Sequence, residues 1–213
     1  RQQLSIYKKL MFVYGILAGG QPSYCIFAAH KKLSGFCPAI NPTSLNLQPM
    51  NKIAMVDLKR QYEKIKPEID QAISDVINST AFINGPAVRA FQEDLEKYLD
   101  VKHVIPCANG TDALQVAMMA LGIKPGDEVI TTNFTFIATA EVIALLGYTP
   151  VVVDVDPETF NIDPDAVRRA ITPKTKAVVP VHLFGQCADM EAMLEIAKEY
   201  NLFVIEDACQ AMG

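Results

Sequence analysis

Apolar residues recur at intervals of three and four positions in two stretches near the middle of the chain. The first stretch, from Asp57 to Ile77, predicts an amphipathic helix that begins near Pro67. The second follows the turn Asn84-Gly85-Pro86 and predicts another amphipathic helix that ends near Asp100. The recurring apolar positions are Ile65, Ile69, Ile73, Val76 and Ile77 in the first stretch and Val88, Phe91, Leu95 and Leu99 in the second.

Downstream of these helices, short runs rich in β-branched residues alternate with helical patterns. Strand, helix and strand in this order indicate right-handed βαβ units. We therefore predict an α/β fold with a mainly parallel sheet and flanking helices. The predicted strands are His103 to Cys107, Glu128 to Thr131, Val151 to Asp154, Ala177 to Val181 and Leu202 to Ile205, and the predicted helices are Thr111 to Leu121, Ile137 to Leu146, Asp165 to Ile171 and Ala188 to Tyr200.

The distribution of charge separates the beginning of the chain from the rest. The sequence carries 24 Asp and Glu, all of which follow Val56, whereas six of its 19 Lys and Arg precede Asp57. Residues 1 to 49 also contain scattered glycines and prolines and show no sustained helix or strand period. We expect residues 1 to 49 to be a disordered head or translated upstream sequence, and residues 50 to 213 to form the domain.

Two other interpretations of the head are weaker. Lys8-Lys9 and the apolar run from Leu10 to Ala18 resemble the start of a signal peptide, but no mature start follows. Gly15 interrupts that run and Gly19-Gly20 end it, and the run is shorter than the ~20 residues of a membrane span. The five cysteines form no CxxC pair, which favours a reducing compartment. We therefore expect a cytoplasmic protein with no metal site and no membrane or nucleic-acid partner.

The segment that follows the first predicted strand has the features of a phosphate site. Gly110 lets the backbone approach a ligand closely, and the helix that starts there offers free N–H groups and the hydroxyl of Thr111. A plain helix cap is the alternative, in which Thr111 or Asp112 satisfies the donors of its own helix.

Aromatic and histidine side chains follow two other predicted strands. Phe134 and Phe136 follow the strand that ends at Thr131, and one of them could stack on a flat heteroaromatic ring. His182 follows the strand that ends at Val181. For each of these residues the alternative is a structural role, as a core aromatic ring or as a hydrogen-bonded histidine.

Asp207 and Gln210 follow the last predicted strand, Leu202 to Ile205. A buried carboxylate costs several kcal/mol unless it is paired, and a protonated ring nitrogen would be a suitable partner for Asp207. The alternative is an aspartate that caps the next helix. Because the phosphate site, the aromatic rings, the carboxylate and the amide all follow strands of one sheet, together they indicate a pyridoxal phosphate pocket.

The same motifs identify a family. From about Ile53 onward the chain resembles the DegT/DnrJ/StrS-type nucleotide-sugar aminotransferases, which have the fold-type-I architecture of aspartate aminotransferase. The matching motifs are Val56-Asp57-Leu58, Phe82-Ile83-Asn84-Gly85-Pro86, Asn109-Gly110-Thr111-Asp112-Ala113-Leu114, Gly126-Asp127-Glu128-Val129-Ile130, Phe134-Thr135-Phe136-Ile137-Ala138-Thr139, Val153-Asp154-Val155-Asp156, Pro180-Val181-His182-Leu183-Phe184-Gly185 and Glu206-Asp207-Ala208-Cys209-Gln210-Ala211.

The resemblance implies a role for each residue of the predicted pocket. Gly110 and Thr111 are expected to hold the phosphate of pyridoxal 5'-phosphate, and Phe136 is expected to stack on its ring. Asp207 is expected to pair with the ring nitrogen, and Gln210 to reach the ring hydroxyl. The pairing of Asp207 keeps the ring nitrogen protonated, which maintains the electron sink of the cofactor.

Weaker expectations concern three further residues. His182 matches a family position near the cofactor, and Asn84 and Gly85 match a loop near the sugar. The Schiff-base lysine that the family carries further downstream is absent from this sequence. Lys174 and Lys176 precede a strand, so we expect them at the opposite rim of the sheet.

The resemblance implies an aminotransferase that converts a nucleotide-linked keto-sugar to an amino sugar for surface glycans. The amino donor is expected to be an amino acid, glutamate in the first place, and the full-length protein is expected to be a homodimer. Without its lysine this chain is expected to be an inactive fragment on its own. The alternatives are a sugar dehydratase of the same family and an inactive or regulatory relative.

Overall fold

The computed structural model describes the backbone of residues 10–13 and all of residues 56–212. The chain divides into two compact units, which are described separately. The first unit contains Cys107–Gly213 together with Arg1–Gln21, and the second contains Pro22–Pro106.

The first unit is built on a parallel sheet. Its strands are ordered β1-β5-β4-β2-β3, and every neighbouring pair is parallel. Residues in β2, β4 and β5 are almost all buried, as expected for central strands that are covered on both faces. The prediction of an α/β fold with a mainly parallel sheet is confirmed. The strands are β1 (Leu10–Val13), β2 (Glu128–Thr132), β3 (Thr149–Val153), β4 (Thr175–Val179) and β5 (Phe203–Asp207).

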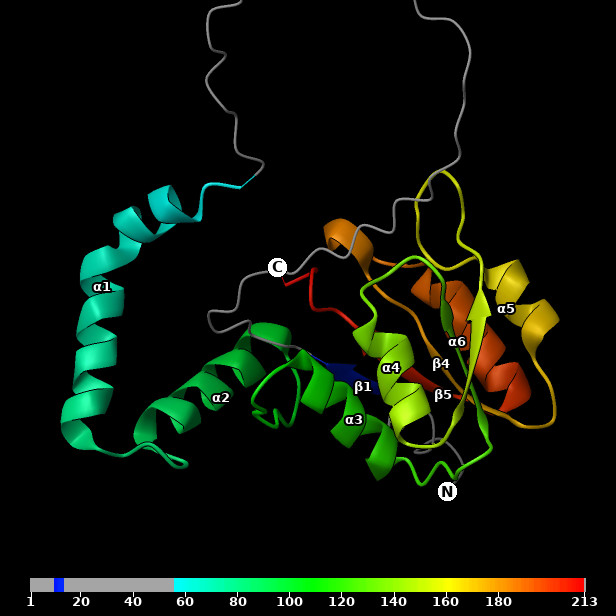
Figure 1. Ribbon diagram of the computed structural model, residues 1–213, viewed down its shortest axis with the longest axis horizontal. Helices are drawn as coiled ribbons and strands as arrows, with labels where there is room; N and C mark the ends of the chain where they lie inside the picture. The colour runs from blue at the N-terminus through cyan, green and yellow to red at the C-terminus, as the bar shows by residue number, and fades with distance from the viewer. Residues whose placement is uncertain (1–9, 14–55, 213) are drawn as a thin grey trace, which may run out of the picture. The chain divides into compact units, whose positions relative to one another are not determined.

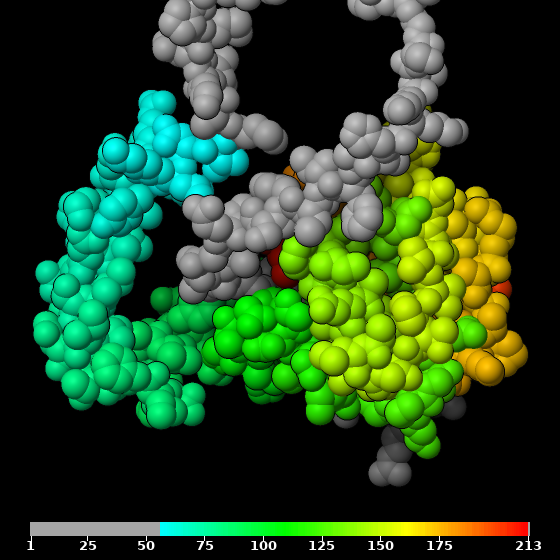
Figure 2. All heavy atoms as spheres, viewed as in Figure 1, coloured from blue at the N-terminus to red at the C-terminus, as the bar shows by residue number. Residues whose placement is uncertain are grey.

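Helices cover both faces of this sheet (Figure 1). On one face α3 (Gly110–Ala120) and α4 (Ala138–Leu145) pack on a core that includes Val129 and Ile205. Figure 2 shows the atoms of α3 and α4 side by side on that face. On the other face α5 (Pro164–Ala170) and α6 (Met190–Tyr200) pack on Ile130 and its neighbours. A short 3-10 turn, η3 (Leu183–Gly185), lies between β4 and α6.

The second unit contains the two amphipathic helices α1 (Leu58–Ser79) and α2 (Pro86–Leu99). The prediction that the first of them begins near Pro67 is wrong. Asp57 caps the helix by accepting a hydrogen bond from the Arg60 N–H at 3.0 Å, and Pro67 lies inside it. A proline tends to start or break a helix, but here the cap before Leu58 supplies the start.

Two further expectations differ from the structure. Residues 103–107, predicted as a strand, belong to no ladder of the sheet. β-Branched composition gives only a preference for extended backbone, and a regular ladder also requires a neighbouring strand in register. Within the head, which was expected to lack regular structure, Leu10–Val13 forms β1 and pairs with β5. The rest of residues 1–49 lies outside the described residues.

None of the helices in residues 56–212 has the length and apolar character that a membrane span requires.

Candidate functional site

The carboxyl ends of the central strands lie together at one edge of the sheet. Thr132 of β2 is in register with Val153 of β3, and Thr131 is in register with Val179 of β4. A further bridge joins Val181 to Asp207 at the end of β5. The chain passes from β2 outward to β3 and then returns to the other side of β2 as β4. Ligands of open α/β sheets bind at such a reversal of strand order, outside the carboxyl ends.

Asp207 is the last residue of β5, and its side chain is buried. The residue is 7% exposed. Its Oδ2 accepts a hydrogen bond from the Thr139 hydroxyl at 2.9 Å, and its Oδ1 accepts one from the Cys209 N–H at 3.3 Å. No ion pair among residues 56–212 includes Asp207. The carboxylate therefore has hydrogen-bond donors but no cation in the described part of the chain.

His182 and Glu206 form a second buried polar pair beside Asp207. The Ala188 N–H donates to His182 Nδ1 at 3.1 Å, so the ring proton must sit on Nε2, which lies 2.8 Å from Glu206 Oε2. The pair is accordingly a hydrogen bond from a neutral imidazole rather than an ion pair. Because both ring nitrogens of His182 are hydrogen-bonded to protein atoms, the geometry favours the structural alternative for this residue over a catalytic role near the cofactor.

Gln210 holds the loop between β4 and α6. Its Oε1 accepts a hydrogen bond from the Phe184 N–H at 2.9 Å. Phe184 has a φ of 55°, a left-handed conformation that is strained for a bulky side chain. Gly185 follows with a φ of 88°, where a Cβ would lie 3.3 Å from the Gln210 carbonyl oxygen. The residue predicted to contact the ring hydroxyl thus also fixes a turn at the same edge.

Asn161 holds the same loop from the other side. The side chain is buried; its Nδ2 donates to the carbonyls of Gln186 and Cys187 at 3.2 and 3.1 Å, and its Oδ1 accepts from the Leu183 N–H at 3.3 Å. Three hydrogen bonds from one side chain therefore link the loop after β3 to the loop after β4.

Phenylalanines from three loops meet at this edge. The Phe134 ring lies 5.8 Å from that of Phe160 and 6.4 Å from that of Phe184, measured between centroids. Phe134 and Phe184 follow β2 and β4, the two strands at which the strand order reverses. Phe136, predicted to stack on a cofactor, is 67% exposed in the segment before α4. Its ring therefore has an open face.

Gly110 and Thr111 begin α3, as predicted, but the cap differs from the alternative expected for this helix. Asn109 is the cap, and its Oδ1 accepts from the Asp112 N–H at 2.9 Å. The next donor, the Ala113 N–H, bonds to the Asn109 carbonyl at 3.1 Å. Within the described part of the chain, no hydrogen bond engages the N–H groups of Gly110 and Thr111, so both remain available to an anion.

The direction of α3 places its first turn at the carboxyl edge. Residues 121–127 join the end of α3 to the start of β2, so the two elements run in opposite directions. At about 1.5 Å per residue the helix spans roughly 16 Å, which matches the length of a five-residue strand at about 3.3 Å per residue. Gly110 therefore lies toward the edge that also carries Asp207.

Asn84 and Gly85 lie in the second unit, in the turn before α2. Asn84 has a φ of 48°, and a Cβ added to Gly85 would lie 2.1 Å from the Ala81 carbonyl oxygen. The turn therefore requires glycine for a local steric reason, which is separate from the predicted contact with a sugar.

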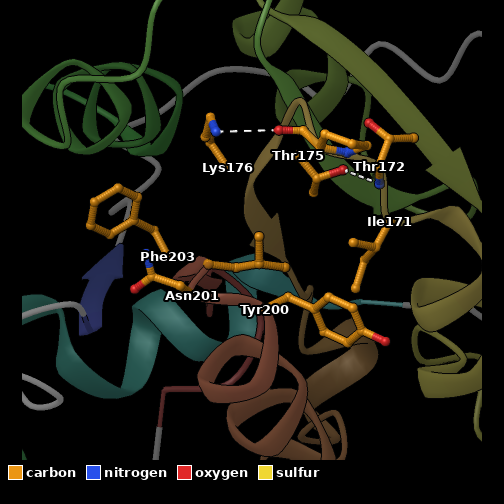
Figure 3. A pocket seen from close by; sticks show the side chains of 9 residues that line it. Ile171, Thr172, Thr175, Lys176, Tyr200, Asn201 and Phe203 are labelled. Carbon is orange, nitrogen blue, oxygen red and sulfur yellow. Dashed lines mark hydrogen bonds between the residues drawn. The ribbon is translucent and has the colours of Figure 1, made fainter.

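Lys176 lies at the opposite edge of the sheet, as predicted, and Lys174 immediately precedes β4. Lys176 lines a hollow of about 500 Å³ at the amino ends of β4 and β5, together with Tyr200 and Phe203. Figure 3 shows these side chains around the hollow. The Lys176 ammonium donates a hydrogen bond to the Pro173 carbonyl oxygen at 3.4 Å. This hollow is separated from Asp207 by the length of the strands and does not contribute to the candidate site.

Sequence reasoning missed three residues that organise the site. Thr139 contacts Asp207, Glu206 contacts His182, and Asn161 holds the loop after β4. A polar residue amid an apolar helix pattern was the available signal for Thr139. The sequence offered no comparable signal for Asn161, because its partners are backbone groups of a distant loop.

Comparison with known proteins gives a consistent assignment. The model of the DegT/DnrJ/EryC1/StrS aminotransferase family matches residues 63–213. The pleiotropic regulatory protein of Geobacillus stearothermophilus is 55% identical over 161 residues, which are 76% of this chain and 43% of that protein. UDP-2-acetamido-2-deoxy-3-oxo-D-glucuronate aminotransferase of Pseudomonas aeruginosa is 52% identical over 161 residues, which are 76% of this chain and 45% of that enzyme.

A solved structure supports the same fold. The crystal structure of NtdA from Bacillus subtilis with bound cofactor PMP superposes with a TM-score of 0.71 and 40% sequence identity, over 79% of this chain and 40% of that one. The chain thus spans less than half of the length of these three proteins.

Proposed function

Because the chain belongs to the DegT/DnrJ/EryC1/StrS aminotransferase family, we propose that the whole protein is a pyridoxal phosphate-dependent aminotransferase. Its substrate is a nucleotide-linked keto-sugar, which becomes an amino sugar for surface glycan synthesis. The amino donor is an amino acid, glutamate by preference. The P. aeruginosa relative, named for an aminotransferase of a UDP-linked oxo-sugar, supports this substrate class.

A single observation carries the proposal: Asp207 is a buried carboxylate with two hydrogen-bond donors and no cation within residues 56–212. An unpaired buried charge costs several kcal/mol, which a cationic ligand would offset. The two carboxylate oxygens offer about four acceptor positions, so a third donor can be accommodated. A protonated pyridine nitrogen has the charge, the donor and the planar shape to serve.

The remaining residues at this edge fit the other parts of the cofactor. The N–H groups of Gly110 and Thr111 and the Thr111 hydroxyl would bind the phosphate at the positive end of α3. Phe136 would stack on the ring, and the Gln210 Nε2–H groups would donate to the ring hydroxyl. When bound, pyridoxal phosphate supplies the electron sink that stabilises negative charge at the substrate carbon.

The amine that binds the cofactor covalently would come from outside this sequence. Lys174 and Lys176 stand at the amino edge of the sheet, away from Asp207. We further propose that the whole protein is a cytoplasmic homodimer and that the turn at Asn84 and Gly85 contacts the sugar. The chain by itself is proposed to be inactive.

A substrate screen tests the proposed activity. The whole protein, loaded with pyridoxal phosphate, is incubated with glutamate and a panel of UDP-, dTDP- and GDP-linked keto-sugars. Formation of 2-oxoglutarate together with the amino sugar is the expected result. Loss of water from the sugar without consumption of glutamate would instead identify a dehydratase.

A regulatory role is the second candidate, because a relative at 55% identity is named a pleiotropic regulatory protein. Binding of the cofactor without turnover of any sugar in the panel would favour this role. Failure to bind either pyridoxal phosphate or pyridoxamine phosphate would contradict the cofactor assignment itself.

A further inference from the structure

Thr139 is the one side-chain donor that holds the Asp207 carboxylate within the described part of the chain. It lies in the first turn of α4 and is fully buried, with 0% exposure. Its hydroxyl donates to Asp207 Oδ2 at 2.9 Å, across 68 positions of sequence. The second donor to this carboxylate is a backbone group, the Cys209 N–H, on Oδ1.

Thr139 lies at the start of α4, where no preceding helical turn offers its hydroxyl a backbone carbonyl. Here the hydroxyl of Thr139 contacts a side chain of β5 instead. The start of α4 has no side-chain cap, and the Glu141 N–H bonds to the Ile137 carbonyl at 2.9 Å, so the Thr139 hydroxyl takes no part in capping its own helix. The arrangement serves the carboxylate rather than the helix.

A hydrogen bond donated to a carboxylate stabilises its charged form relative to its protonated form. When a buried carboxylate faces a pyridine nitrogen, one proton is shared between them, and it can rest on either atom. Donors on the carboxylate favour the state in which the proton rests on the nitrogen. That state is the one in which the ring withdraws electrons from the substrate.

We propose that Thr139 is a positioning residue of the reaction: its hydroxyl keeps Asp207 charged and correctly oriented, so that the shared proton stays on the ring nitrogen of the bound cofactor. The inference rests on the proposed function. It adds a residue that never touches substrate or cofactor but sets the electronic state of the ring through Asp207.

The location of the proton can be measured without turnover. The whole protein is saturated with pyridoxamine phosphate labelled with ¹⁵N in the ring, and the ¹⁵N chemical shift of the bound nitrogen is recorded at neutral pH. In Thr139→Val, which keeps shape but loses the hydroxyl, the shift is expected to move from the pyridinium range toward neutral pyridine. Loss of one charge-assisted hydrogen bond to Asp207 changes the ratio of protonated to unprotonated ring nitrogen by about ten- to hundredfold.

Two variants separate this role from simple packing. Thr139→Ser retains the hydroxyl and should restore the parent shift. Thr131→Val is the matched control, because Thr131 is equally buried and its hydroxyl donates to the Val179 carbonyl at 3.0 Å rather than to Asp207. It should leave the shift unchanged. Thr139→Ala replaces the valine variant if the latter does not fold.

A kinetic measurement gives a second readout. In the half-reaction with glutamate, Thr139→Val should lower kcat by about ten- to hundredfold while KM changes little, and Thr139→Ser should recover the rate. An unchanged ¹⁵N shift and unchanged kcat in Thr139→Val would overturn the inference and leave the proposed function standing. If the parent protein does not bind pyridoxamine phosphate at all, both the proposed function and this inference fail.

Discussion

Replacing Asp207 with asparagine should change stability and cofactor affinity in opposite directions. Asparagine has the same shape as aspartate. Its Oδ1 can accept from the Cys209 N–H and its Nδ2 can donate to the Thr139 hydroxyl, so both hydrogen bonds at Asp207 are retained. The substitution therefore removes the buried charge and little else.

The expected change in the free energy of unfolding follows from the burial of Asp207 and from the groups that contact it. Asp207 is 7% exposed and belongs to no ion pair among residues 56–212. Relief of an unpaired buried charge is worth several kcal/mol, and the weakening of two charge-assisted hydrogen bonds offsets about half of it. We expect the cofactor-free protein to gain about 1–3 kcal/mol in free energy of unfolding, or roughly 2–10 °C in Tm.

Affinity for pyridoxamine phosphate should fall in the same variant. Removing one partner of a buried, hydrogen-bonded charge pair costs about 2–5 kcal/mol, so the Kd should rise by roughly 30- to 4,000-fold. The assay combines thermal unfolding of the cofactor-free protein with titration calorimetry. Pyridoxamine phosphate is used because it forms no Schiff base with the protein.

The neighbouring acid provides the control. Glu206 is also buried, but it already accepts a hydrogen bond from His182 at 2.8 Å. Glu206→Gln should therefore lose about 1 kcal/mol of stability and retain its affinity for pyridoxamine phosphate. If Asp207→Asn destabilises the cofactor-free protein and leaves this affinity unchanged, the reasoning about its charge is refuted.

Three further predictions concern the surroundings of the site and the second unit. Asn161→Ala removes three hydrogen bonds to the loop before α6 and should lower the free energy of unfolding by about 2–4 kcal/mol in chemical denaturation; a loss below 0.5 kcal/mol would contradict its role. Gly85→Ala forces a Cβ to within 2.1 Å of the Ala81 carbonyl oxygen and should reduce the helical circular dichroism signal or Tm, whereas an unchanged melting curve would show that the turn adapts freely. The Thr159 and Glu158 N–H groups hold the pKa of Asp156 below its usual 3.8, so the turn they form is stabilised above that pH and should loosen as the pH falls through the folded-state pKa; amide exchange at Thr159 measures this, and Asp156→Asn should abolish the pH dependence.

Local periodicity was sufficient to predict most helices and strands of the first unit. Strands β2 to β5 and helices α3 to α6 all occur within a few residues of their predicted bounds, because a β-branched run and an apolar period of 3.6 residues are properties of the segment itself. The predictions were wrong where the structure of a segment depended on a helix cap or on pairing with a neighbouring strand. The cap at Asp57 started α1 despite Pro67, and residues 103–107 joined no ladder of the sheet.

The order of residues along the chain was enough to predict which polar groups reach the carboxyl edge. Asp207 ends β5, Gln210 follows it by three residues, and Gly110 starts α3. The hydrogen-bond partners of these groups depend on the folded arrangement of the sheet. The bonds from Thr139 to Asp207 and from His182 to Glu206 join residues 68 and 24 positions apart. A pattern read along the chain reports the neighbours within a few residues, whereas these contacts depend on strand order and register, which are set by packing across the whole sheet.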